Sequence, residues 1–539
     1  MPTKSKHAAF DIPEVSLNNY FLSRIKEYGS EVALIDSVTE EKQLTFKQVY
    51  EQIQSCGRYF QEQNIGEGDV VGLVLPNCVE YIIAMMGVIS CGAAISPCNP
   101  LYKEGEMQHI FKITEPKMLI VSDESINNVK QVLKHYSENQ VKQIIVLGKS
   151  NEFETWDEVM LSKNENIENF VPHCKISPRK TLAILPYSSG TTGLPKCVMH
   201  NHYSTISTML CFCFTIHAML VLISRHHSQY KRGETYYNER PMFHGGGFMF
   251  VLAVLQGGLS VVMDQEFDVE RTLFAIQKYK VNHMFVVPPN LLQLSQTELH
   301  DKYDITSWKT SITGGASIPT TVMKSVIDRF NVKLIPVYAM TECCPISWKD
   351  NDDSVLDSAG SICVNSEFMI VDPNTGKELK YGREGEIWTK GPQVTVGYYK
   401  NTEATEQTIP KDGYLRTGDI GVIKDKKLYV IGRLKEVIKY KTLQVAPAEI
   451  ENVLLSHPDV EDAGVVGVPD PTCGELPKAF VVRKVESLTA DELQTLIKNE
   501  LIDYKQLRGG IKFVNKIPKS KLGKINRLEL KTWATEKDN

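Results

Sequence analysis

The chain has 539 residues, 42% of them hydrophobic and 23% charged, which predicts a soluble globular protein of two or more domains. A net charge of −5 and a pI near 6.3 give no electrostatic case for a nucleic-acid partner. The twelve cysteines show neither Cys-x-x-Cys pairs nor metal-ligand spacing, which excludes a zinc or disulfide framework and favours a reducing compartment.

The two ends of the chain carry no recognisable address. Residues 1–7 lack an apolar signal core, and residues 536–539 do not form the peroxisomal Ser-Lys-Leu signal. We therefore expect a cytoplasmic protein, with a peroxisomal location by another signal left open.

The first 350 residues alternate short apolar runs with amphipathic segments. Alternation of this kind predicts an α/β fold of parallel or mixed sheets flanked by helices, in which ligands bind beyond the carboxyl ends of the strands. The predicted strands are 70–75, 117–121, 143–147, 182–185, 259–263, 283–287, 310–313 and 333–337, and two of the predicted helices are 269–280 and 320–330.

A loop rich in hydroxyl groups follows the predicted strand at 182–185. Glycines let backbone N–H groups converge on an anion, while hydroxyls add donors and a lysine adds a charge, so the loop predicts a site for a nucleotide phosphate tail. Its residues are Ser188, Ser189, Gly190, Thr191, Thr192, Gly193 and Lys196. The spacing is not that of a Walker P-loop, which disfavours a kinase or P-loop ATPase. A simple polar turn is the alternative.

An apolar run follows, from 209 to 224 within the segment 208–228. It is shorter than the roughly 20 residues that a membrane helix needs and it contains His217, so we predict a buried helix and no transmembrane span. Whether 208–228 is a genuine insert or an artefact of the gene sequence stays open.

The pattern of predicted elements changes after Lys349. Strands predicted at 368–372, 385–389 and 429–431 indicate a small β-rich subdomain, and a compact α+β pattern restarts with a helix near Pro447. Thr489 and Glu492 have the spacing of a capping box that opens a further helix. We predict an N-terminal domain over 1–431, a hinge over 432–436 and a mobile C-terminal domain over 437–539.

The phosphate-loop sequence resembles that of the adenylate-forming (AMP-binding) superfamily, in its branch of acyl-CoA synthetases, coumarate–CoA ligases and insect luciferases. Further motifs of the family occur in the expected order, and the resemblance spans roughly residues 30 to 530. These motifs are Pro241-Met242-Phe243-His244, Gly314-Gly315-Ala316, Tyr338-Ala339-Met340-Thr341-Glu342, Tyr414-Leu415-Arg416-Thr417-Gly418-Asp419, Gly432-Arg433-Leu434-Lys435-Glu436 and Pro518-Lys519-Ser520-Lys521-Leu522-Gly523-Lys524.

The resemblance implies an ATP site. Glu342 is at the family position for Mg²⁺, Thr341 at the position that touches the α-phosphate, and Lys524 at that of the lysine bridging the substrate carboxylate and the α-phosphate. Asp419 resembles the aspartate that accepts hydrogen bonds from the ribose hydroxyls, and Arg433 would contact ribose or phosphate. Other residues implied near the nucleotide are Gly315, Ala316, Tyr338 and Ala339. Without the resemblance, Asp419 could equally be a turn residue, and Lys524 could equally belong to a solvated basic cluster.

The resemblance also implies an acyl pocket and a second half-reaction with coenzyme A. His244, Gly245 and Gly314 would border the acyl group, although His244 alone also reads as a core or turn histidine. Gly245, Gly246 and Gly247 are expected to leave volume on one pocket wall. The C-terminal domain of the family swings about a hinge, here at Lys435, and Lys439 begins the segment that would line the pantetheine tunnel.

Three positions depart from the family pattern. Cys197 and Ala339 stand where glycine is usual, and an alanine is tolerated unless its φ must be positive. Thr442 replaces the glycine that lets the backbone approach the thiol arm, and a β-branched residue restricts that approach. Thr442 therefore puts thioester formation in doubt more than adenylation.

The sequence therefore predicts an acid–thiol ligase that uses ATP, Mg²⁺ and CoA and acts on a fatty or aromatic acid. No aspartate that would hold a substrate amine is evident, which disfavours amino-acid activation. The alternatives are an enzyme that stops at the adenylate or oxidises it as luciferases do, and a non-catalytic nucleotide-binding protein. The acid preferred and the choice between monomer and homodimer are left open.

Overall fold

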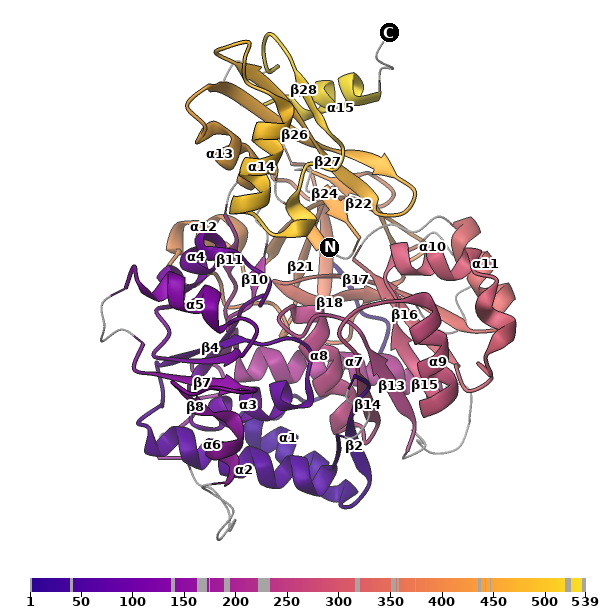
Figure 1. The fold of residues 1–539 in the computed structure, drawn as a ribbon. Coiled ribbons are helices and arrows are strands. Elements are labelled where there is room, and N and C mark those ends of the chain that lie inside the picture. The colour runs from indigo at the N-terminus through magenta and orange to yellow at the C-terminus, as the bar shows by residue number, and fades with distance from the viewer. Residues whose placement is uncertain are drawn as a thin grey trace.

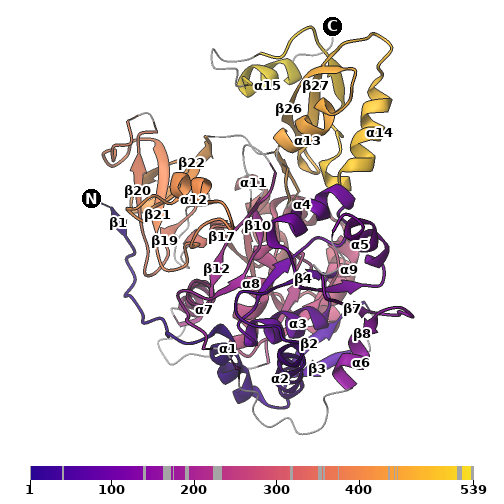
Figure 2. The same ribbon diagram turned by 90° about the vertical axis from the view of Figure 1, so that its left-hand side faces the viewer.

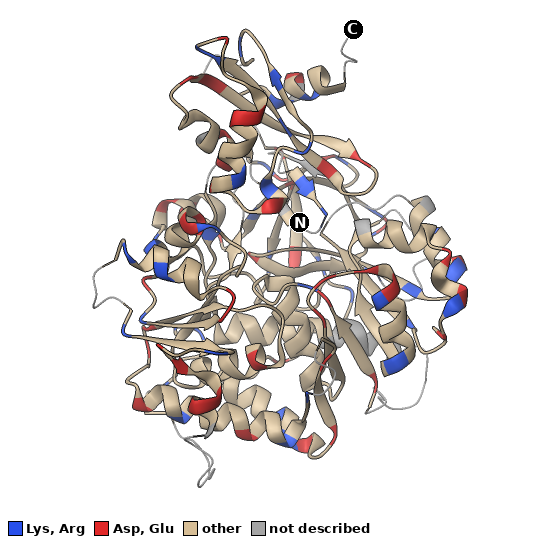
Figure 3. Ribbon diagram, in the orientation of Figure 1, with Lys and Arg blue, Asp and Glu red and all other residues tan. Residues whose placement is uncertain are grey.

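The computed structural model describes residues 2–38, 42–136, 141–161, 172–173, 175–188, 194–221, 233–315, 320–349, 355, 358–373, 375–434, 438–441, 443–445, 447–518 and 525–535. The bulk of the chain forms a large N-terminal domain, and the C-terminal domain sits on it as a separate lobe (Figure 1). Acidic and basic residues alternate over both lobes (Figure 3), which agrees with the small net charge.

A seven-stranded sheet forms one layer of the N-terminal domain. Its strands are parallel except for the edge strand β12, which pairs antiparallel with β9. The strand order is β12 (His200–Asn201), β9 (Leu182–Ile184), β5 (Ala94–Pro97), β4 (Val70–Val74), β6 (Met118–Ser122), β7 (Gln143–Leu147) and β8 (Glu154–Thr155). The helices of this part are α2 (Phe46–Glu62), α3 (Val79–Ser90), α4 (Glu104–Thr114), α5 (Ile126–Leu133) and α6 (Trp156–Leu161).

A nine-stranded sheet forms the second layer, with a parallel centre and antiparallel edges. Its order is β19 (Ser361–Ile362), β18 (Cys343–Trp348), β17 (Lys333–Met340), β16 (Thr310–Gly314), β15 (Val281–Phe285), β13 (Thr235–Asn238), β14 (Ser260–Met263), β2 (Val32–Asp36) and β3 (Gln43–Thr45). The N-terminal domain also contains the helices α1 (Leu17–Ile25), α7 (His202–Val221), α8 (Gly245–Gln256), α9 (Val269–Tyr279), α10 (Pro288–Gln296) and α11 (Thr320–Phe330), with 3₁₀ turns η1 (Lys26–Tyr28) and η2 (Leu299–Lys302).

The main core lies between these two sheets. Every residue of α3 is buried, and α8 is almost as fully enclosed. Both helices are apolar on all sides, which is the pattern of a helix with no solvent-facing surface. One hydrophobic cluster joins them to α1, α2, α7 and strands of both sheets, so the two sheets are held in a fixed relation.

The β-rich subdomain is an antiparallel sheet whose edge strand comes from the N-terminus of the chain (Figure 2). Its strands, in order, are β1 (Thr3–Lys4), β20 (Glu367–Val371), β21 (Gly385–Lys390), β22 (Leu415–Lys424) and β23 (Lys427–Arg433), and α12 (Thr402–Thr408) lies beside it. A separate hairpin pairs β10 (Tyr187–Ser188) with β11 (Lys196–Cys197).

The C-terminal domain has a sheet and a hydrophobic core of its own. Its elements are β24 (Ile438–Tyr440), β25 (Leu443–Val445), α13 (Pro447–Leu455), β26 (Val460–Asp470), β27 (Gly474–Arg483), α14 (Ala490–Glu500), η3 (Asp503–Lys505), β28 (Ile511–Phe513) and α15 (Arg527–Thr535). The capping box of Thr489 and Glu492 opens α14, as predicted. In both views α13 and α14 face α4 of the N-terminal domain (Figures 1 and 2).

The predicted elements are confirmed within a few residues, and the mixed α/β fold with them. The apolar run after the phosphate loop lies in α7, which begins at His202 rather than at Met209, and the described side chains Met209, Cys211 and Phe212 are buried. None of the helices in the described ranges combines the length and apolar character of a membrane span. Residues 222–228 of that segment lie outside the described residues.

The phosphate loop, Gly315 and Glu342 follow strands of two different sheets. The loop follows β9 of the seven-stranded sheet, whereas Gly315 and Glu342 follow β16 and β17 of the nine-stranded sheet. In addition, β23 continues past Ile431, since Gly432 pairs with Ile420 and Arg433 with Asp419. These pairs attach the backbone of residues 432 and 433 to the β-rich sheet, and the hinge predicted over 432–436 stays a prediction, since residues 435 and 436 lie outside the described residues.

Candidate active site

The phosphate loop and Glu342 meet where the two sheets approach each other. Ser188, at the end of β10, donates a hydrogen bond from Oγ to Glu342 Oε1 at 2.8 Å. Tyr398 donates its hydroxyl to the same oxygen, also at 2.8 Å. Two donors from distant parts of the chain therefore fix one carboxylate oxygen. Residues 189–193 lie outside the described residues.

Burial makes this small network strong. Glu342 is only 5% exposed, and hydrogen bonds to an ionised acceptor strengthen when water is excluded. Burial, followed by the carboxylate of Glu342, raises the pKa of Tyr398 above its ordinary value, so the phenol remains a donor at neutral pH. The Lys196 Nζ lies 4.9 Å from the centre of the Tyr398 ring, which brings a positive charge to the same place.

The donor set at this point fits a magnesium ion that arrives with a nucleotide. Mg²⁺ in such sites takes one or two carboxylates, and substrate phosphates and water supply its other ligands. Glu342 supplies one carboxylate beside two hydroxyls. No group of three or more His, Cys, Asp or Glu side chains suited to a metal occurs in the described part of the chain. A cage made by the protein alone is therefore not seen among these residues.

Thr341 and Glu342 are tied to the seven-stranded sheet by a second contact. His200 Nε2, on the edge strand β12, lies 2.9 Å from the Thr341 carbonyl oxygen. Burial lowers the pKa of His200 to about 4, so the ring is neutral at physiological pH. Because a carbonyl only accepts, the proton of the neutral ring is assigned to Nε2. This bond fixes the backbone of Thr341.

Asp419 is held in place by Tyr338. The Tyr338 hydroxyl donates to Asp419 Oδ2 at 2.7 Å. Asp419 is buried on β22, directly opposite Arg433 on β23. The structure therefore brings the tyrosine of one motif to the aspartate of another, and it places the backbone of Arg433 opposite that aspartate.

A cavity of about 70 Å³ opens next to Thr341. Every described residue predicted for the acyl pocket lines it, together with several predicted for the nucleotide: His244, Gly245, Gly314, Gly315, Ala339 and Thr341. Gly314 ends β16, where a Cβ would collide with the Val337 carbonyl of the neighbouring strand. Gly315 has a φ of 89°, a left-handed value that favours glycine.

His244 caps the helix that forms one wall of this cavity. Its Nδ1 accepts the N–H of Gly246 at 3.2 Å, at the start of α8. Burial, followed by repulsion from Arg240, lowers the pKa of His244 to about 4. A neutral ring whose Nδ1 accepts carries its proton on Nε2.

The expectation about the three glycines after His244 is only partly right. A side chain at Gly245 would meet nothing within 4 Å, so this position does border open volume. The space beside Gly246 is instead filled by the guanidinium of Arg240, and Gly247 lies against the Pro241 carbonyl. Close packing, rather than an open wall, therefore accounts for two of the three.

The lysines expected to act in the two half-reactions belong to the C-terminal domain. Lys439 lies on β24, and its backbone N–H donates to Glu475 Oε2 at 2.7 Å. Lys524, Lys435, Thr442 and Ala316 lie outside the described residues. The described ends of the Lys524 loop are joined, because the Asn526 N–H donates to the Pro518 carbonyl at 2.8 Å.

Two of the departures from the family pattern are accommodated. Ala339 lies within β17 and is not among the non-glycine residues with positive φ. The condition under which alanine would be excluded is therefore not met. Cys197 is buried on β11, and burial raises the pKa of its thiol to about 12, which makes it an inert core residue.

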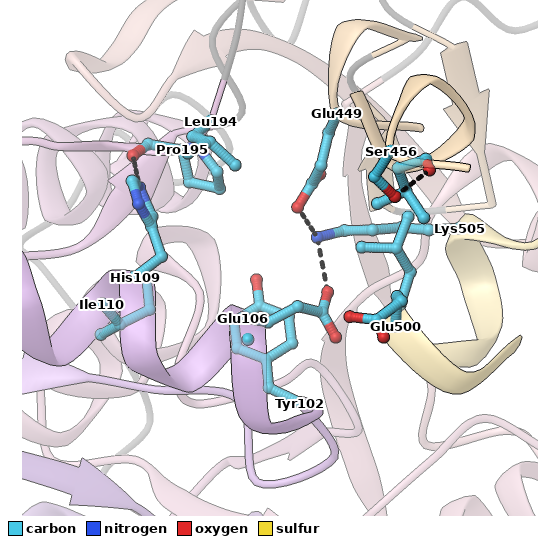
Figure 4. Close-up of a pocket in the computed structure, with 13 residues that line it drawn as sticks. Tyr102, Glu106, His109, Ile110, Leu194, Pro195, Glu449, Ser456, Glu500 and Lys505 are labelled. Carbon is cyan, nitrogen blue, oxygen red and sulfur yellow. Dashed lines mark hydrogen bonds and ion pairs between the residues drawn. The ribbon is translucent and has the colours of Figure 1, made fainter. Parts of the chain in front are cut away.

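The C-terminal domain docks onto α4 beside the phosphate loop (Figure 4). Lys505 Nζ lies 2.8 Å from both Glu106 Oε1 on α4 and Glu449 Oε1 on α13. On the same helix, His109 Nε2 lies 3.0 Å from the carbonyl of Pro195 in the phosphate loop. A cavity of about 290 Å³ separates these contacts. One helix thus touches both the phosphate loop and the C-terminal domain.

Sequence reasoning missed Tyr398, His200 and the ion group around Lys505. Tyr398 stands in Gly397-Tyr398-Tyr399 and His200 in Met199-His200-Asn201, and neither stretch has the composition of a charged or glycine-rich site. In the sequence, Lys505 is distinguished only by following Tyr504 in the short segment after α14. All three acquire their role from partners more than 50 residues away.

Two family models match the chain. Residues 21–399 match the family described as AMP-binding enzyme, and residues 449–524 match its C-terminal domain. The chain is 35% identical to a probable 4-coumarate–CoA ligase 1 of Dictyostelium discoideum over 98% of this chain and 97% of that one. It is also 35% identical to 4-coumarate–CoA ligase 1 of Solanum tuberosum, over 98% and 96% respectively.

A solved structure has the same fold. The amide bond synthetase McbA from Marinactinospora thermotolerans superposes with a TM-score of 0.82 at 24% identity, covering 95% of this chain and 99% of that one. With both domains matched in order, the chain belongs to the AMP-binding enzyme family, the adenylate-forming enzymes.

Proposed function

We propose that this enzyme activates a carboxylic acid with ATP and Mg²⁺ to form an acyl-adenylate, and then transfers the acyl group to CoA. The observation that carries the proposal is the buried Glu342 carboxylate, fixed by Ser188 and Tyr398 beside Lys196. The names of the relatives at 35% identity, which are 4-coumarate–CoA ligases, support the same reaction.

In the first step an oxygen of the acid attacks the α-phosphorus, and the bond to pyrophosphate breaks. Negative charge grows on the phosphate oxygens, so preorganised donors and cations stabilise the transition state. The hydroxyl- and glycine-rich loop from Ser188 to Lys196 would hold the β- and γ-phosphates, and Lys524 would bridge the acid and the α-phosphate. Glu342 would hold Mg²⁺, which neutralises phosphate charge when bound.

Asp419 and Tyr338 would fix the other end of the nucleotide. Their 2.7 Å hydrogen bond leaves the carboxylate oriented to accept from ribose hydroxyls. Orientation of this kind holds the α-phosphorus in line with the acid. Thr341, whose carbonyl is fixed by His200, would touch the α-phosphate.

In the second step the CoA sulfur attacks the acyl carbon, and AMP leaves. We propose that the C-terminal domain turns about a hinge at Lys435, which withdraws Lys524 and brings the segment from Lys439 to the thiol arm. The swing would separate Lys505 from Glu106, because these residues belong to different domains. A fatty or aromatic acid, the latter of the phenylpropanoid type, is the proposed substrate class.

Pyrophosphate release tests this proposal. A panel of fatty and aromatic acids is supplied with ATP and Mg²⁺, with and without CoA. We expect release that depends on the acid, and acyl-CoA when CoA is present. Lys524→Ala is expected to lose both products, whereas Lys439→Ala keeps adenylate formation and loses thioester. A folded protein that releases no pyrophosphate with any acid contradicts the proposal.

Thr442 favours a second candidate, an enzyme that stops at the adenylate. A threonine in place of glycine narrows the path proposed for the thiol arm. This candidate predicts acid-dependent exchange of pyrophosphate into ATP with no consumption of CoA. Thr442→Gly would then gain thioester formation, whereas a complete ligase already shows it.

A further inference from the structure

Arg240 is a charged side chain built into the wall of the acyl cavity. It lies between β13 and α8, immediately before the Pro241–His244 motif. Asn77 Nδ2 and Asn238 Nδ2 donate to its backbone carbonyl at 2.9 and 3.1 Å. The backbone is therefore fixed, and the side chain lines the cavity.

The surroundings of the guanidinium are apolar on two sides. Its Cζ lies 3.9 Å from the centre of the Phe285 ring, and Gly246 leaves the space that its nitrogens occupy. Nη1 is closed off from solvent and has no hydrogen-bond partner among the described residues. Arg240 as a whole is half-buried, and an unmet donor on a cation that is partly shielded from water is costly unless a partner is supplied.

The protein itself supplies little compensation for this charge. The carboxylate that acts on Arg240 electrostatically is Glu239, which accepts from Asn290 at 3.3 Å and whose Oε2 has no partner among the described residues. No ion pair joins Glu239 to Arg240. Burial raises the pKa of Glu239 to about 7, so at neutral pH it is only partly ionised. Burial also lowers the pKa of Arg240, although a guanidinium stays protonated.

No other described residue that lines the cavity is charged at neutral pH. His200 and His244 are neutral because their pKa values are about 4, and the remaining lining is apolar, glycine or Thr341. Aromatic and aliphatic walls suit a carbon skeleton, whereas a guanidinium suits a second carboxylate, which it can bind with two parallel hydrogen bonds.

We propose that Arg240 determines substrate specificity by binding a second anionic group, so that the preferred acid carries a carboxylate or comparable anion besides the one that is activated. This inference rests on the proposed function and names the chemistry of its acyl substrate. It makes Arg240 a binding residue that contacts the far end of the acid, away from the carboxylate that attacks ATP.

Matched pairs of acids test the proposal with the full-length enzyme. The pairs are hexanoate with hexanedioate, benzoate with benzene-1,3-dicarboxylate, and cinnamate with 4-carboxycinnamate. In at least one pair, kcat/KM for adenylate formation should be higher for the diacid. Arg240→Met should lower kcat/KM for the diacid by about 10- to 100-fold, the range for a hydrogen bond to a charged group. The same substitution should leave kcat/KM for the monoacid unchanged or raise it. For Arg240→Lys, kcat/KM for the diacid should lie between the values for the wild type and Arg240→Met.

Glu239→Gln is the matched control, because it removes the neighbouring charge without touching the cavity wall. It should preserve the diacid preference. The inference is overturned if no pair shows a preference, if Arg240→Met weakens both members equally, or if Glu239→Gln abolishes the preference.

Calorimetric titration with the same pairs, in the presence of a non-hydrolysable ATP analogue, separates this inference from the proposed function. Tighter binding of the diacid that is lost in Arg240→Met supports the inference even without turnover. Turnover of monoacids alone supports the function and contradicts the inference.

Discussion

Ser188 Oγ and Glu342 Oε1 lie 2.8 Å apart, although their residues are 154 positions apart in the chain and belong to different sheet systems. Glu342 is only 5% exposed, and this hydrogen bond orients its carboxylate before any ligand binds. The site therefore depends on how the two sheets are packed.

Glu342→Gln should keep the fold and lose adenylation by about 10²- to 10³-fold, since it removes the negative charge proposed to hold the metal while an amide oxygen still accepts from Ser188. The measurement is acid-dependent pyrophosphate exchange at several Mg²⁺ concentrations. The exposed Glu406→Gln serves as control and should match the wild type. An unchanged rate in Glu342→Gln would contradict the role given to this carboxylate.

Tyr338→Phe should raise the KM for ATP about fivefold, which corresponds to about 1 kcal/mol for one lost hydrogen bond to Asp419. The KM for the acid should stay unchanged. Steady-state kinetics with each substrate varied in turn check this. Tyr381→Phe, on an exposed tyrosine of the β-rich subdomain, is the control. Equal changes in both KM values would indicate a general disturbance instead.

His202→Asn should make stability less sensitive to pH below 6.5. Burial lowers the pKa of His202 to about 4, whereas an unfolded histidine titrates near 6.5. Between these values the unfolded chain binds a proton that the folded protein does not, so stability present above pH 6.5 is lost as the pH falls. An asparagine oxygen can still accept the Leu17 N–H that Nδ1 accepts at 3.0 Å.

Denaturant titrations from pH 7 to pH 4.5 measure this effect. As the pH falls, the free energy of unfolding of the wild type should decrease by about 1.4 kcal/mol per pH unit more than that of His202→Asn, which is the slope for one proton. Parallel curves for the two proteins would show that His202 titrates normally in the folded state.

Lys505→Met should loosen the docking of the C-terminal domain, because removing one member of a buried ion group leaves the Glu106 and Glu449 charges without their partner. Burial alone would lower the pKa of Lys505, but Tyr504, Glu449 and Glu106 outweigh it and raise the pKa, so the lysine is charged. The N–H of Ile502 donates to Glu106 Oε2 at 2.9 Å across the same interface.

Amide exchange at Ile502 reports this contact directly. It should become at least tenfold faster in Lys505→Met, while amides of β26 and β27 keep their protection. The exposed Lys498→Met on α14 should exchange like the wild type. Uniformly faster exchange throughout the C-terminal domain would instead mean that the domain core is destabilised.

Local features of the fold were predictable because they depend on local patterns. The strand predicted at 143–147 and the helix at 320–330 coincide with β7 and α11. The helix predicted to end at 280 ends at Tyr279, where Lys280 takes a left-handed φ of 50° as its C-cap. Apolar periodicity and caps determine such boundaries over a few residues.

The division of the strands between two sheets was not predictable in the same way. Strand periodicity is identical in either sheet, and the choice depends on which helices fill the space between them, chiefly α3 and α8. The same non-local packing brings Tyr398 to Glu342 and the Arg240 guanidinium to Gly246. Glu342, Ser188 and Tyr338 were therefore named from sequence, whereas Tyr398, which also orients Glu342, was not.

The fate of the acyl group in a single turnover tests most directly whether the reaction passes through an acyl-adenylate. Enzyme in excess is mixed with ATP labelled at the α-phosphate and an acid that it turns over, and CoA is added after a delay. We predict that labelled acyl-AMP accumulates on the enzyme before CoA is added, and that it decays to AMP as acyl-CoA appears. Cleavage of ATP to ADP, or acyl-CoA formed with no adenylate at any time, would contradict the account.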